Sequence, residues 1–371
     1  MKIGIVTPRY PPNHAGGGEI SVQLLANQLH SHETVNNLEV FSFDGTTTET
    51  VEGVQVSRLS DVPQYPYSLP NEIAYRKLKS VDRDFDLLHA YNMHLHPAVG
   101  RLAAERDIPT VATLNAYPLL DWASIGVTPS LQRRLYESTV LRLERPRLRK
   151  QIQQIELLLP LSSAVERVYR ENGFDGPEYE VVPNMLDPEF ELPTNIEGDS
   201  TELLYVGYLR DSKGVRYLID AMKHVSSDLT LKIVGDGPTR EALETRVSEM
   251  GLSNRVRFTG QVPYEEVTRS YATADVFVHP GVWPEPFGRT ILEAMQAGLP
   301  VVATNVGGPA ETIKQQEMLC PPADPVSMAD AIEQAYDRRD EYGAKNREYV
   351  RATYHPDVVV PQFVSAYERL L

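Results

Sequence analysis

The stretch WPEPFGRTILEAMQAGLPVVATNVGGPAE, residues 283–311, places one glutamate where an idle charge is uncommon. Glu285 stands between Pro284 and Pro286, which stiffen the backbone and keep this residue out of a helix. A carboxylate is a charged acceptor that makes strong hydrogen bonds to hydroxyl groups. An exposed surface glutamate is the alternative, but this rigid loop follows a predicted strand, where the ligands of parallel α/β sheets bind. Glu285 is therefore a candidate for contacts with sugar hydroxyls.

The helix that follows offers a second carboxylate and a phosphate site. Gly288 opens the helical sequence RTILEAMQAG, and Glu293 lies about one turn inside it. The N–H groups of Gly288, Arg289 and Thr290 lack intrahelical partners at such a helix start, so we expect them to be available to a phosphate. The pattern indicates a ligand that carries both phosphate groups and hydroxyls.

Two cations follow another predicted strand. Arg210 and Lys213 lie in the loop VGYLRDSKG, residues 206–214, close enough in sequence to reach one ligand. Cations at this place could neutralise a diphosphate leaving group. The alternative is that both are solvated surface charges. For a basic pair considered without its surroundings, this alternative would be preferred.

Glycine clusters mark two more loops. AGGGE, residues 15–19, follows the first strand, and its glycines would let backbone N–H groups approach a ligand where a helix begins. A flexible turn is the alternative, and the dinucleotide pattern G-x-G-x-x-G does not follow this strand. VGDGP, residues 234–238, is typical of a tight strand-to-helix turn rather than of a binding loop.

These loops connect alternating strands and helices. The first half predicts strands in KIGIVTP, NLEVFSF, DLLHAY, IPTVATLN and IELLLPLS, and the second half in ELLYVGYL, LTLKIVG, RVRFTG, ADVFVHP and LPVVATN. Such alternation implies parallel sheets covered by helices on both faces. A segment rich in Pro, Asn and Asp near residues 183–200 separates the two series. We expect two doubly wound α/β domains that face one another across a cleft, over residues 1–185 and 186–352, and a C-terminal helix over 353–371 that packs back on the first domain.

Composition excludes several classes of protein. The chain has 371 residues and a formal net charge of -15, which argues against a general nucleic-acid binder. No apolar run approaches the roughly 20 residues of a membrane-spanning helix, and the apolar start is too short for a signal peptide, so a cytoplasmic protein is expected. Cys320 is the one cysteine, which excludes an intrachain disulfide.

The signature stretch resembles that of family 4 of the retaining glycosyltransferases, which have the GT-B fold of two Rossmann-like domains. PPNHAGGGE, VVPNMLD, SKGVRYLIDAM, IVGDGPTREALE and VRFTGQVPYEEV are similar to further parts of that family, so the resemblance covers most of the chain. The two glutamates, with their FG and EAM neighbours, are its most specific part. It implies transfer of a sugar, here expected to be a hexose, from a nucleotide-diphosphate sugar, with retention at the anomeric carbon and no required metal.

The resemblance also implies roles for single residues. Glu285 would hold hydroxyls of the donor sugar, Glu293 would hold the ribose hydroxyls, and Lys213 would bind the diphosphate. The backbone near Val262 would meet the base. Together with the reading from the residues, this gives the catalytic set Glu285, Lys213 and Arg210 and the donor-binding set Gly17, Gly18, Val262, Phe287, Gly288, Arg289, Thr290 and Glu293.

Two positions depart from the family pattern. Tyr208 stands where the family usually has an arginine, and Arg210 could reach the same phosphate from a different angle. The segment TLNAY places Asn115 where many members carry a histidine, and an amide cannot take a proton at neutral pH. His94 and His96, in YNMHLHP, are candidates with Asn115 for contacts with the acceptor. Ordinary loop histidines are the alternative.

Three functions stay open on the sequence. The favoured one is a retaining transferase that acts on a glycan acceptor, which could be lipid-linked. A GT-B nucleotide-sugar epimerase shares the two-domain plan, and a nucleotide-sugar-binding protein that has lost catalysis would agree with Tyr208 and Asn115. A glycoside hydrolase fits poorly because its two carboxylates must flank one bond.

The stretch RRLYESTVLRLERPRLRK, residues 133–150, is basic within an acidic chain. It has seven cations against Glu137 and Glu144, a local charge of +5 (7 − 2). Leucines interleaved with cations are typical of a helix on an anionic membrane surface, so we predict a weak, salt-dependent association with the inner face of the cell membrane. A solvated helix whose arginines pair with acids elsewhere is the alternative. The cations are Arg133, Arg134, Arg142, Arg145, Arg147, Arg149 and Lys150.

Overall fold

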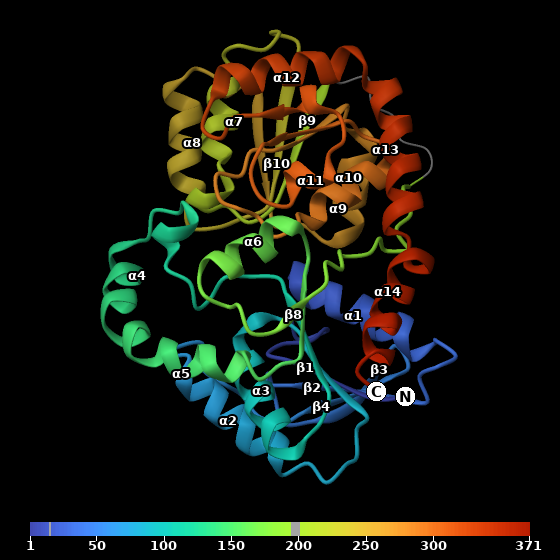
Figure 1. Ribbon diagram of the computed structural model, residues 1–371. Helices are drawn as coiled ribbons and strands as arrows, with labels where there is room; N and C mark the ends of the chain where they lie inside the picture. The colour runs from blue at the N-terminus through green and yellow to red at the C-terminus, as the bar shows by residue number, and fades with distance from the viewer. Residues whose placement is uncertain (15, 194–200) are drawn as a thin grey trace. The chain divides into compact units, whose positions relative to one another are not determined.

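Two parallel sheets, each with helices packed against it, organise the chain (Figure 1). The computed structural model describes residues 1–14, 16–193 and 201–371, without the side chain of Glu265. These residues divide into unit 1, Met1–Met185 with Pro356–Leu371, and unit 2, Leu186–His355. Ala15 of the first glycine loop and residues 194–200 of the expected boundary segment lie outside the described residues.

Unit 1 is built on an eight-stranded sheet in the order β3-β4-β2-β1-β5-β6-β7-β8. Neighbouring strands are parallel except in the β3–β4 hairpin. The strands are β1 (Lys2–Thr7), β2 (Asn37–Ser42), β3 (Thr48–Val51), β4 (Val54–Arg58), β5 (Leu87–Ala90), β6 (Thr110–Leu114), β7 (Leu157–Pro160) and β8 (Glu178–Tyr179). The strands predicted in this half are confirmed as β1, β2, β5, β6 and β7, and the structure adds β3, β4 and β8.

The helices of unit 1 connect these strands. They are α1 (Gly17–His30), α2 (Ser68–Lys79), α3 (His96–Arg106), α4 (Leu131–Tyr136), α5 (Arg142–Ile152), α6 (Ser163–Glu171) and α14 (Pro356–Glu368). One π-helical turn, Glu137–Leu141, joins α4 to α5. Strands β5 and β7 are buried along their whole length, because helices cover the parallel sheet on both faces.

Helix α14 returns to unit 1 after the chain has built unit 2. Its side chains Val359 and Phe363 are buried in the same core as Val22 and Leu25 of α1. The hydroxyl group of Tyr367, also in α14, lies 2.7 Å from the Nδ1 of His89. The Nε2 of His89 lies 2.8 Å from the Thr113 hydroxyl. The end of the chain therefore completes the core and satisfies a buried imidazole of the central sheet.

Unit 2 has a six-stranded, wholly parallel sheet in the order β11-β10-β9-β12-β13-β14. Its strands are β9 (Glu202–Val206), β10 (Thr230–Val234), β11 (Val256–Gly260), β12 (Val276–His279), β13 (Val301–Thr304) and β14 (Leu319–Cys320). Its helices are α7 (Val215–Ala221), α8 (Arg240–Glu249), α9 (Tyr264–Thr273), α10 (Arg289–Ala297), α11 (Pro309–Thr312), α12 (Pro325–Asp337) and α13 (Arg339–Tyr354). The predicted strands are confirmed as β9 to β13, and β14 is an addition at the edge. None of the helices that the described residues form is long and apolar enough to cross a membrane.

Four histidines are held as neutral imidazoles: His89, His96 and His279 are buried, and His94 is half-buried. Burial lowers the pKa of His89 and His96 to about 3 and that of His94 and His279 to about 4, from the usual 6.5. At pH values between the lowered pKa of a histidine and the usual 6.5, that histidine binds a proton in the unfolded chain but not in the folded chain. Its contribution to the free energy of unfolding is therefore complete above pH 6.5 and is lost as the pH falls towards the folded-state pKa.

We expect the free energy of unfolding to fall between pH 7 and pH 5, by about 2 kcal/mol at pH 5 for each buried histidine. Carboxylates titrate mostly below this window. Urea unfolding at the two pH values measures the loss. His89→Gln should unfold more easily at pH 7 but show a smaller pH dependence, whereas the exposed His224→Gln should keep the wild-type pH dependence. Equal stability of the wild type at pH 7 and pH 5 would contradict neutral burial.

Candidate functional site

The backbone of Glu285 is clamped by the other end of the signature stretch. The Gly308 N–H donates to the carbonyl oxygen of Glu285 at 2.7 Å. Gly307 has a φ of +66°, and a Cβ added there would lie 2.4 Å from the same oxygen. A Cβ on Gly308 would lie 2.3 Å from the carbonyl oxygen of Pro286. The loop after β12 and the loop after β13 can approach this closely because both positions lack a side chain.

The side chain of Glu285 joins two loops of unit 2. Its Oε2 accepts a hydrogen bond from the Nζ of Lys213 at 2.5 Å and one from the Nε1 of Trp283 at 2.6 Å. Only 17% of the Lys213 side chain and 16% of the Glu285 side chain are exposed. Lys213 follows β9 and Glu285 follows β12, and these strands are neighbours in the sheet. Their carboxyl ends therefore meet at one edge, as the sequence predicted for these two loops.

Electrostatics keep Glu285 ionised in this partly buried place. Burial raises the pKa of the carboxyl group, but the ammonium group of Lys213 outweighs it and, with smaller contributions from His279 and Trp283, lowers the pKa to about 2. The Oε1 atom accepts no hydrogen bond from any described residue. Glu285 therefore keeps an unused acceptor oxygen at neutral pH.

A second cation lies beside the same indole. The guanidinium carbon of Arg210 is 5.3 Å from the centre of the Trp283 ring, and the Nζ of Lys213 is 5.7 Å from it. The Nε of Arg210 is buried without a hydrogen-bond partner among the described residues. Gly214 ends this loop and has a φ of +69°. A Cβ added to Gly214 would lie 1.9 Å from the carbonyl oxygen of Pro280. The two cations and the one carboxylate give the cluster a net positive charge, which favours an anionic ligand.

Helix α10 begins at the same edge of the sheet. Gly288 precedes it with a φ of +92°, and a Cβ there would lie 2.9 Å from the Cδ1 of Ile291. Glu293, 8% exposed, accepts hydrogen bonds from the Tyr271 hydroxyl at 2.8 Å and from the Nε of Arg289 at 3.1 Å. Burial raises the pKa of Glu293, although Arg289 and Tyr271 oppose the rise. The Nη1 of Arg289 is buried with no hydrogen-bond partner in the described part of the chain.

Three further candidates of unit 2 lie in different surroundings. Phe287 is 3% exposed, and its ring packs edge-on against Tyr354 with the centroids 5.5 Å apart. Thr290 is half-buried in the first turn of α10. Val262 follows the edge strand β11 and lines a surface cavity of about 540 Å³ with Lys232 and Arg257. Phe287 is therefore placed to support the loop from inside, and Val262 lines a hollow beside β11.

The VGDGP loop connects β10 to α8, as the strand-to-helix turn predicted from its sequence. Gly235 and Gly237 have φ values of +135° and +159°. A Cβ on Gly235 would lie 2.0 Å from the carbonyl oxygen of Gly207, and one on Gly237 would lie 2.2 Å from that of Leu209. The loop thus supports the segment that leads from β9 to Arg210.

Unit 1 holds a cavity of about 320 Å³ at the carboxyl ends of its strands. Asn92 lies there in the left-handed region, with a φ of +57°. Its side-chain amide donates to the Thr7 hydroxyl at 3.1 Å and accepts a hydrogen bond from the amide of Asn115. A Cβ on Gly18 would lie 2.5 Å from the Oδ1 of Asn92, so this contact requires the glycine. The lining residues are Pro8, Arg9, Gly18, Glu19, Phe43, Val62, Pro63, Gln64, Pro70, Asn92, His94, Leu95, Asn115 and Ala116.

The sequence candidates of unit 1 are only partly brought together. His94, Asn115 and Gly18 line the cavity, whereas His96 is fully buried at the first residue of α3. Gly17 begins α1 and would have open space around a Cβ. Asn92 was missed by the sequence reading, because neither its left-handed backbone nor its contact with Gly18 is visible in a residue pattern.

Comparisons with known proteins agree with this arrangement. Residues 15–190 match a family model described as Glycosyltransferase Family 4, and residues 188–353 match one described as Glycosyl transferases group 1. An uncharacterized glycosyltransferase of Methanocaldococcus jannaschii is 29% identical over 333 residues, which cover 85% of this chain and 83% of that protein. The phosphatidyl-myo-inositol mannosyltransferase of Mycobacterium leprae is 28% identical over 386 residues, covering 99% of this chain and 96% of that protein.

Solved structures show the same fold. Sucrose-phosphate synthase from Thermosynechococcus elongatus matches with a TM-score of 0.84 and 23% identity, over 100% of this chain and 98% of that one. The lipopolysaccharide outer core galactosyltransferase WaaB matches with a TM-score of 0.72 and 16% identity over both whole chains. Since the two family models together run from residue 15 to residue 353 and both units have the predicted parallel sheets, the chain belongs to family 4 of the retaining glycosyltransferases, which are nucleotide-sugar-dependent enzymes of the GT-B fold.

Proposed function

We propose that this enzyme transfers a hexose from a nucleotide-diphosphate sugar to a glycan acceptor, with Glu285, Lys213 and Arg210 at the reacting end of the donor. The observation that carries this proposal is the Lys213–Glu285 pair, in which a carboxylate with an unused oxygen is bonded to one cation while a second, Arg210, lies beside the same indole. A carboxylate suits sugar hydroxyls, and cations suit a diphosphate.

The proposed reaction keeps the sugar on the same face. The bond between the anomeric carbon and the diphosphate oxygen breaks, and the electron pair goes to that oxygen. The acceptor hydroxyl forms the new bond from the same side and gives its proton to the leaving phosphate. Lys213 and Arg210 stabilise the charge that develops on the diphosphate, while Glu285 orients the sugar through its hydroxyls.

Helix α10 supports the rest of the donor in this proposal. The N–H groups at Gly288, Arg289 and Thr290 bind the diphosphate, because helix starts favour anions. Glu293 binds the ribose hydroxyls through the acceptor capacity left beside its bonds from Tyr271 and Arg289. The backbone near Val262 meets the base, and Phe287 acts from the core by holding the loop.

The cavity of unit 1 is the proposed acceptor site. Asn92, Asn115 and the neutral imidazole of His94 offer hydrogen bonds to hydroxyls, and Gly17 and Gly18, the donor contacts expected from the sequence, lie at the start of α1. No side chain here needs to act as a base if the leaving phosphate takes the proton. We propose a lipid-linked glycan as the acceptor, which the surface of α4 and α5 described below supports.

Loss of either member of the ion pair should stop most transfer. We expect Lys213→Ala and Glu285→Gln to lower kcat about 100- to 1000-fold, which corresponds to roughly 2.7–4 kcal/mol of transition-state stabilisation. Lys223→Ala and Glu348→Gln, which change exposed charges of the same unit, are the matched controls and should leave kcat unchanged. A folded Lys213→Ala or Glu285→Gln variant within a few-fold of wild type would remove that residue from the proposed mechanism.

Glu293 should act on donor binding more than on chemistry. Glu293→Gln keeps the size of the side chain but removes the charge that ribose hydroxyls would bind, so we expect KM for the donor to rise about tenfold with a smaller change in kcat. Steady-state kinetics at varied donor concentration measure both. If Glu293 serves only the fold, the variant will instead have a lower Tm and an unchanged KM.

The cations should make a divalent metal dispensable. Because Lys213, Arg210 and the start of α10 would neutralise the diphosphate, we expect full activity in EDTA and an anomeric product of retained configuration. NMR of the product and a metal titration test this. Activity that EDTA removes and magnesium restores would contradict the proposed role of the cations, and turnover of the donor to an isomer without acceptor would favour an epimerase.

A further inference from the structure

The segment from α4 to α5 exposes apolar side chains that a folded unit would normally bury. Eleven large hydrophobic side chains of the described residues are exposed, and six of them lie on this segment or beside it. Leu131 and Leu143 are 82% and 83% exposed, and Leu135 and Val140 are 65% and 42% exposed. We call these four residues the leucine surface. The other two, Tyr65 and Leu69, belong to a neighbouring stretch: the Tyr65 and Tyr136 rings are 5.2 Å apart, and the N–H of Ser68, next to Leu69, donates to Glu144 at 2.9 Å.

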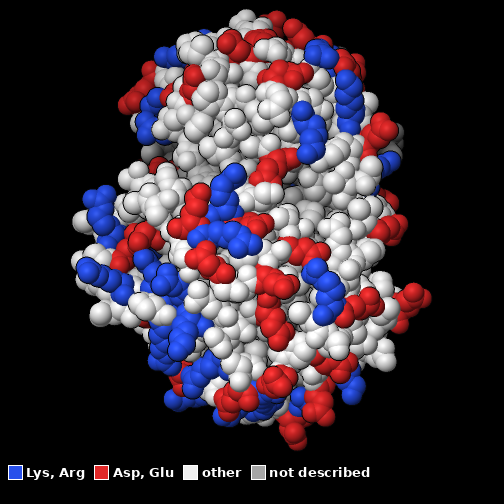
Figure 2. Space-filling model, viewed as in Figure 1, with Lys and Arg blue, Asp and Glu red and all other residues white. Residues whose placement is uncertain are grey.

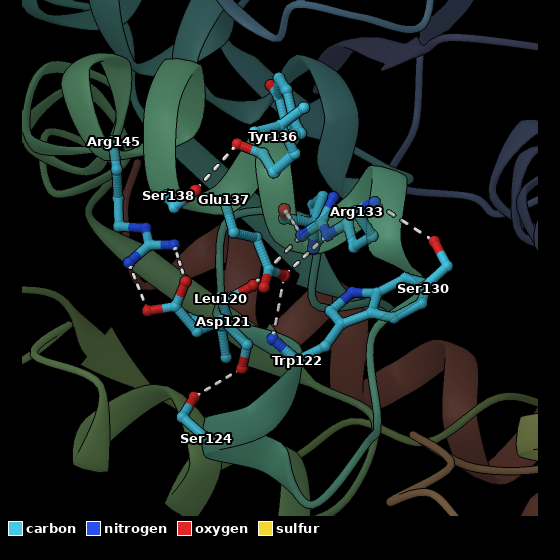
Figure 3. A network of polar contacts seen from close by, with 12 residues as sticks. Leu120, Asp121, Trp122, Ser124, Ser130, Arg133, Tyr136, Glu137, Ser138 and Arg145 are labelled. Carbon is cyan, nitrogen blue, oxygen red and sulfur yellow. Dashed lines mark hydrogen bonds and ion pairs between the residues drawn. The ribbon is translucent and has the colours of Figure 1, made fainter.

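Buried polar contacts fix which way this segment faces (Figure 3). The Nε of Arg133 donates to the Glu137 carboxylate at 2.7 Å, and the same carboxylate accepts from the Trp122 N–H at 3.1 Å. The Nη2 of Arg133 also donates to the carbonyl oxygens of Pro118 and Leu120. Since Arg133 and Glu137 point inward, the leucines between and around them are held outward.

Contacts of this kind turn both acids of the segment towards the protein and leave several of its cations exposed. Glu137 is buried, and Glu144 accepts the backbone N–H groups of Tyr67 and Ser68 at 3.1 and 2.9 Å, so both acids face the protein. Of the cations, Arg133 is buried and Arg145 donates to Asp121. The exposed charged side chains between residues 131 and 150 are all basic: Arg134, Arg142, Arg147 and Lys150.

We propose that the leucine surface docks on an anionic lipid surface and brings a lipid-linked acceptor to unit 1. Apolar side chains that stand out between cations suit the boundary of a bilayer with acidic headgroups. Figure 2 shows blue and white side chains gathered over α4 and α5, with some red ones between them, on the face of unit 1 that this view presents. The chain as a whole carries a net charge of -15, so this local excess of exposed cations has the opposite sign to the net charge of the protein.

A second copy of the chain fits this surface less well. A symmetric dimer would place the same patch on both sides of the interface, so the exposed arginines would face each other. Like charges in an apolar contact are costly. Lipid headgroups instead provide the opposite charge.

Tyr67 connects the segment to the wall of the proposed acceptor cavity. The Nη1 of Arg133 donates to the Tyr67 hydroxyl at 3.3 Å, and the Tyr67 ring lies 5.7 Å from that of His94, which lines the cavity. A glycan held by its lipid at the leucine surface would therefore start close to the cavity that is proposed to bind it. This step rests on the proposed function.

The structure changes the expected origin of the binding. The sequence predicted a salt-dependent association carried by seven cations, but Arg133 and Arg145 are used inside unit 1. Arg149 is only half-exposed and lies 3.5 Å from the carbonyl oxygen of Asn172. The leucines should therefore contribute most of the affinity, and the arginines should contribute the preference for anionic lipid.

Vesicle co-sedimentation of the full chain tests the proposal. The probes are vesicles of phosphatidylcholine alone and of phosphatidylcholine with phosphatidylglycerol, each at low and high salt. We expect the wild type to bind the anionic vesicles, and Leu131→Ser/Leu135→Ser/Leu143→Ser to lower the partition coefficient about tenfold or more. The matched control, Val326→Ser/Val358→Ser, changes exposed valines of other helices and should bind as wild type.

The cations are tested in the same assay. Arg134→Gln/Arg142→Gln should lower binding to anionic vesicles several-fold and remove most of its dependence on salt, because fewer counter-charges are left to screen. The control Lys223→Gln/Arg351→Gln removes two exposed cations of unit 2 and should keep the wild-type salt dependence.

Three results would overturn the proposal. They are a wild type that stays in the supernatant with anionic vesicles, a leucine variant that binds as well as wild type, and a wild-type dimer in light scattering that the leucine variant turns into a monomer. The last result would assign the surface to a second copy. Thermal stabilisation by a nucleotide sugar is measured in parallel, because its absence would sink the proposed function while leaving the vesicle result standing.

Discussion

The ion pair between Lys213 and Glu285 connects two loops that are 72 residues apart, and the chemistry proposed for unit 2 depends on it. A buried carboxylate would normally take up a proton, but the ammonium group beside it lowers its pKa to about 2. The same contact orders Lys213, which would otherwise be a flexible surface cation. One bond thus provides a charged acceptor for hydroxyls and a fixed cation for a diphosphate, and neither group could serve as well without the other.

Backbone contacts at glycines allow this pair to form. Gly214 lets the loop after β9 approach the carbonyl oxygen of Pro280, and Gly307 lets the loop after β13 approach Glu285. Each approach is closer than any Cβ would permit. The glycines of the signature therefore serve packing between loops first, and the same loops hold Gly288 at the start of α10, where the phosphate site is proposed.

The sequence predicted the parallel core well, since strands such as β7 are short, continuous apolar runs between helices. It did not predict the β3–β4 hairpin, whose strands are partly polar and whose two-residue turn, Glu52 and Gly53, is not one of the strong hairpin dipeptides such as Asn-Gly. The loops of Lys213 and Glu285 were expected to meet, but their direct bond was not. Contacts such as that of Asn92 with Gly18 depend on tertiary structure, and no spacing in the chain reports them.

The segment from α4 to α5 shows most clearly how folding changes what composition suggests. Counted along the chain, Arg133 and Glu137 contribute a cation and an acid to a basic helix. In the fold the two neutralise each other inside unit 1, and Trp122 and the carbonyl oxygens of Pro118 and Leu120 complete the contact. The alternative of arginines paired with acids is therefore correct for the inward face and for Arg147, which lies 3.7 Å from Glu72, whereas Arg134, Arg142 and Lys150 stay exposed beside the leucines. A single helix can thus hold its unit together through one face and present the other to a charged surface, because burial assigns each residue to one role.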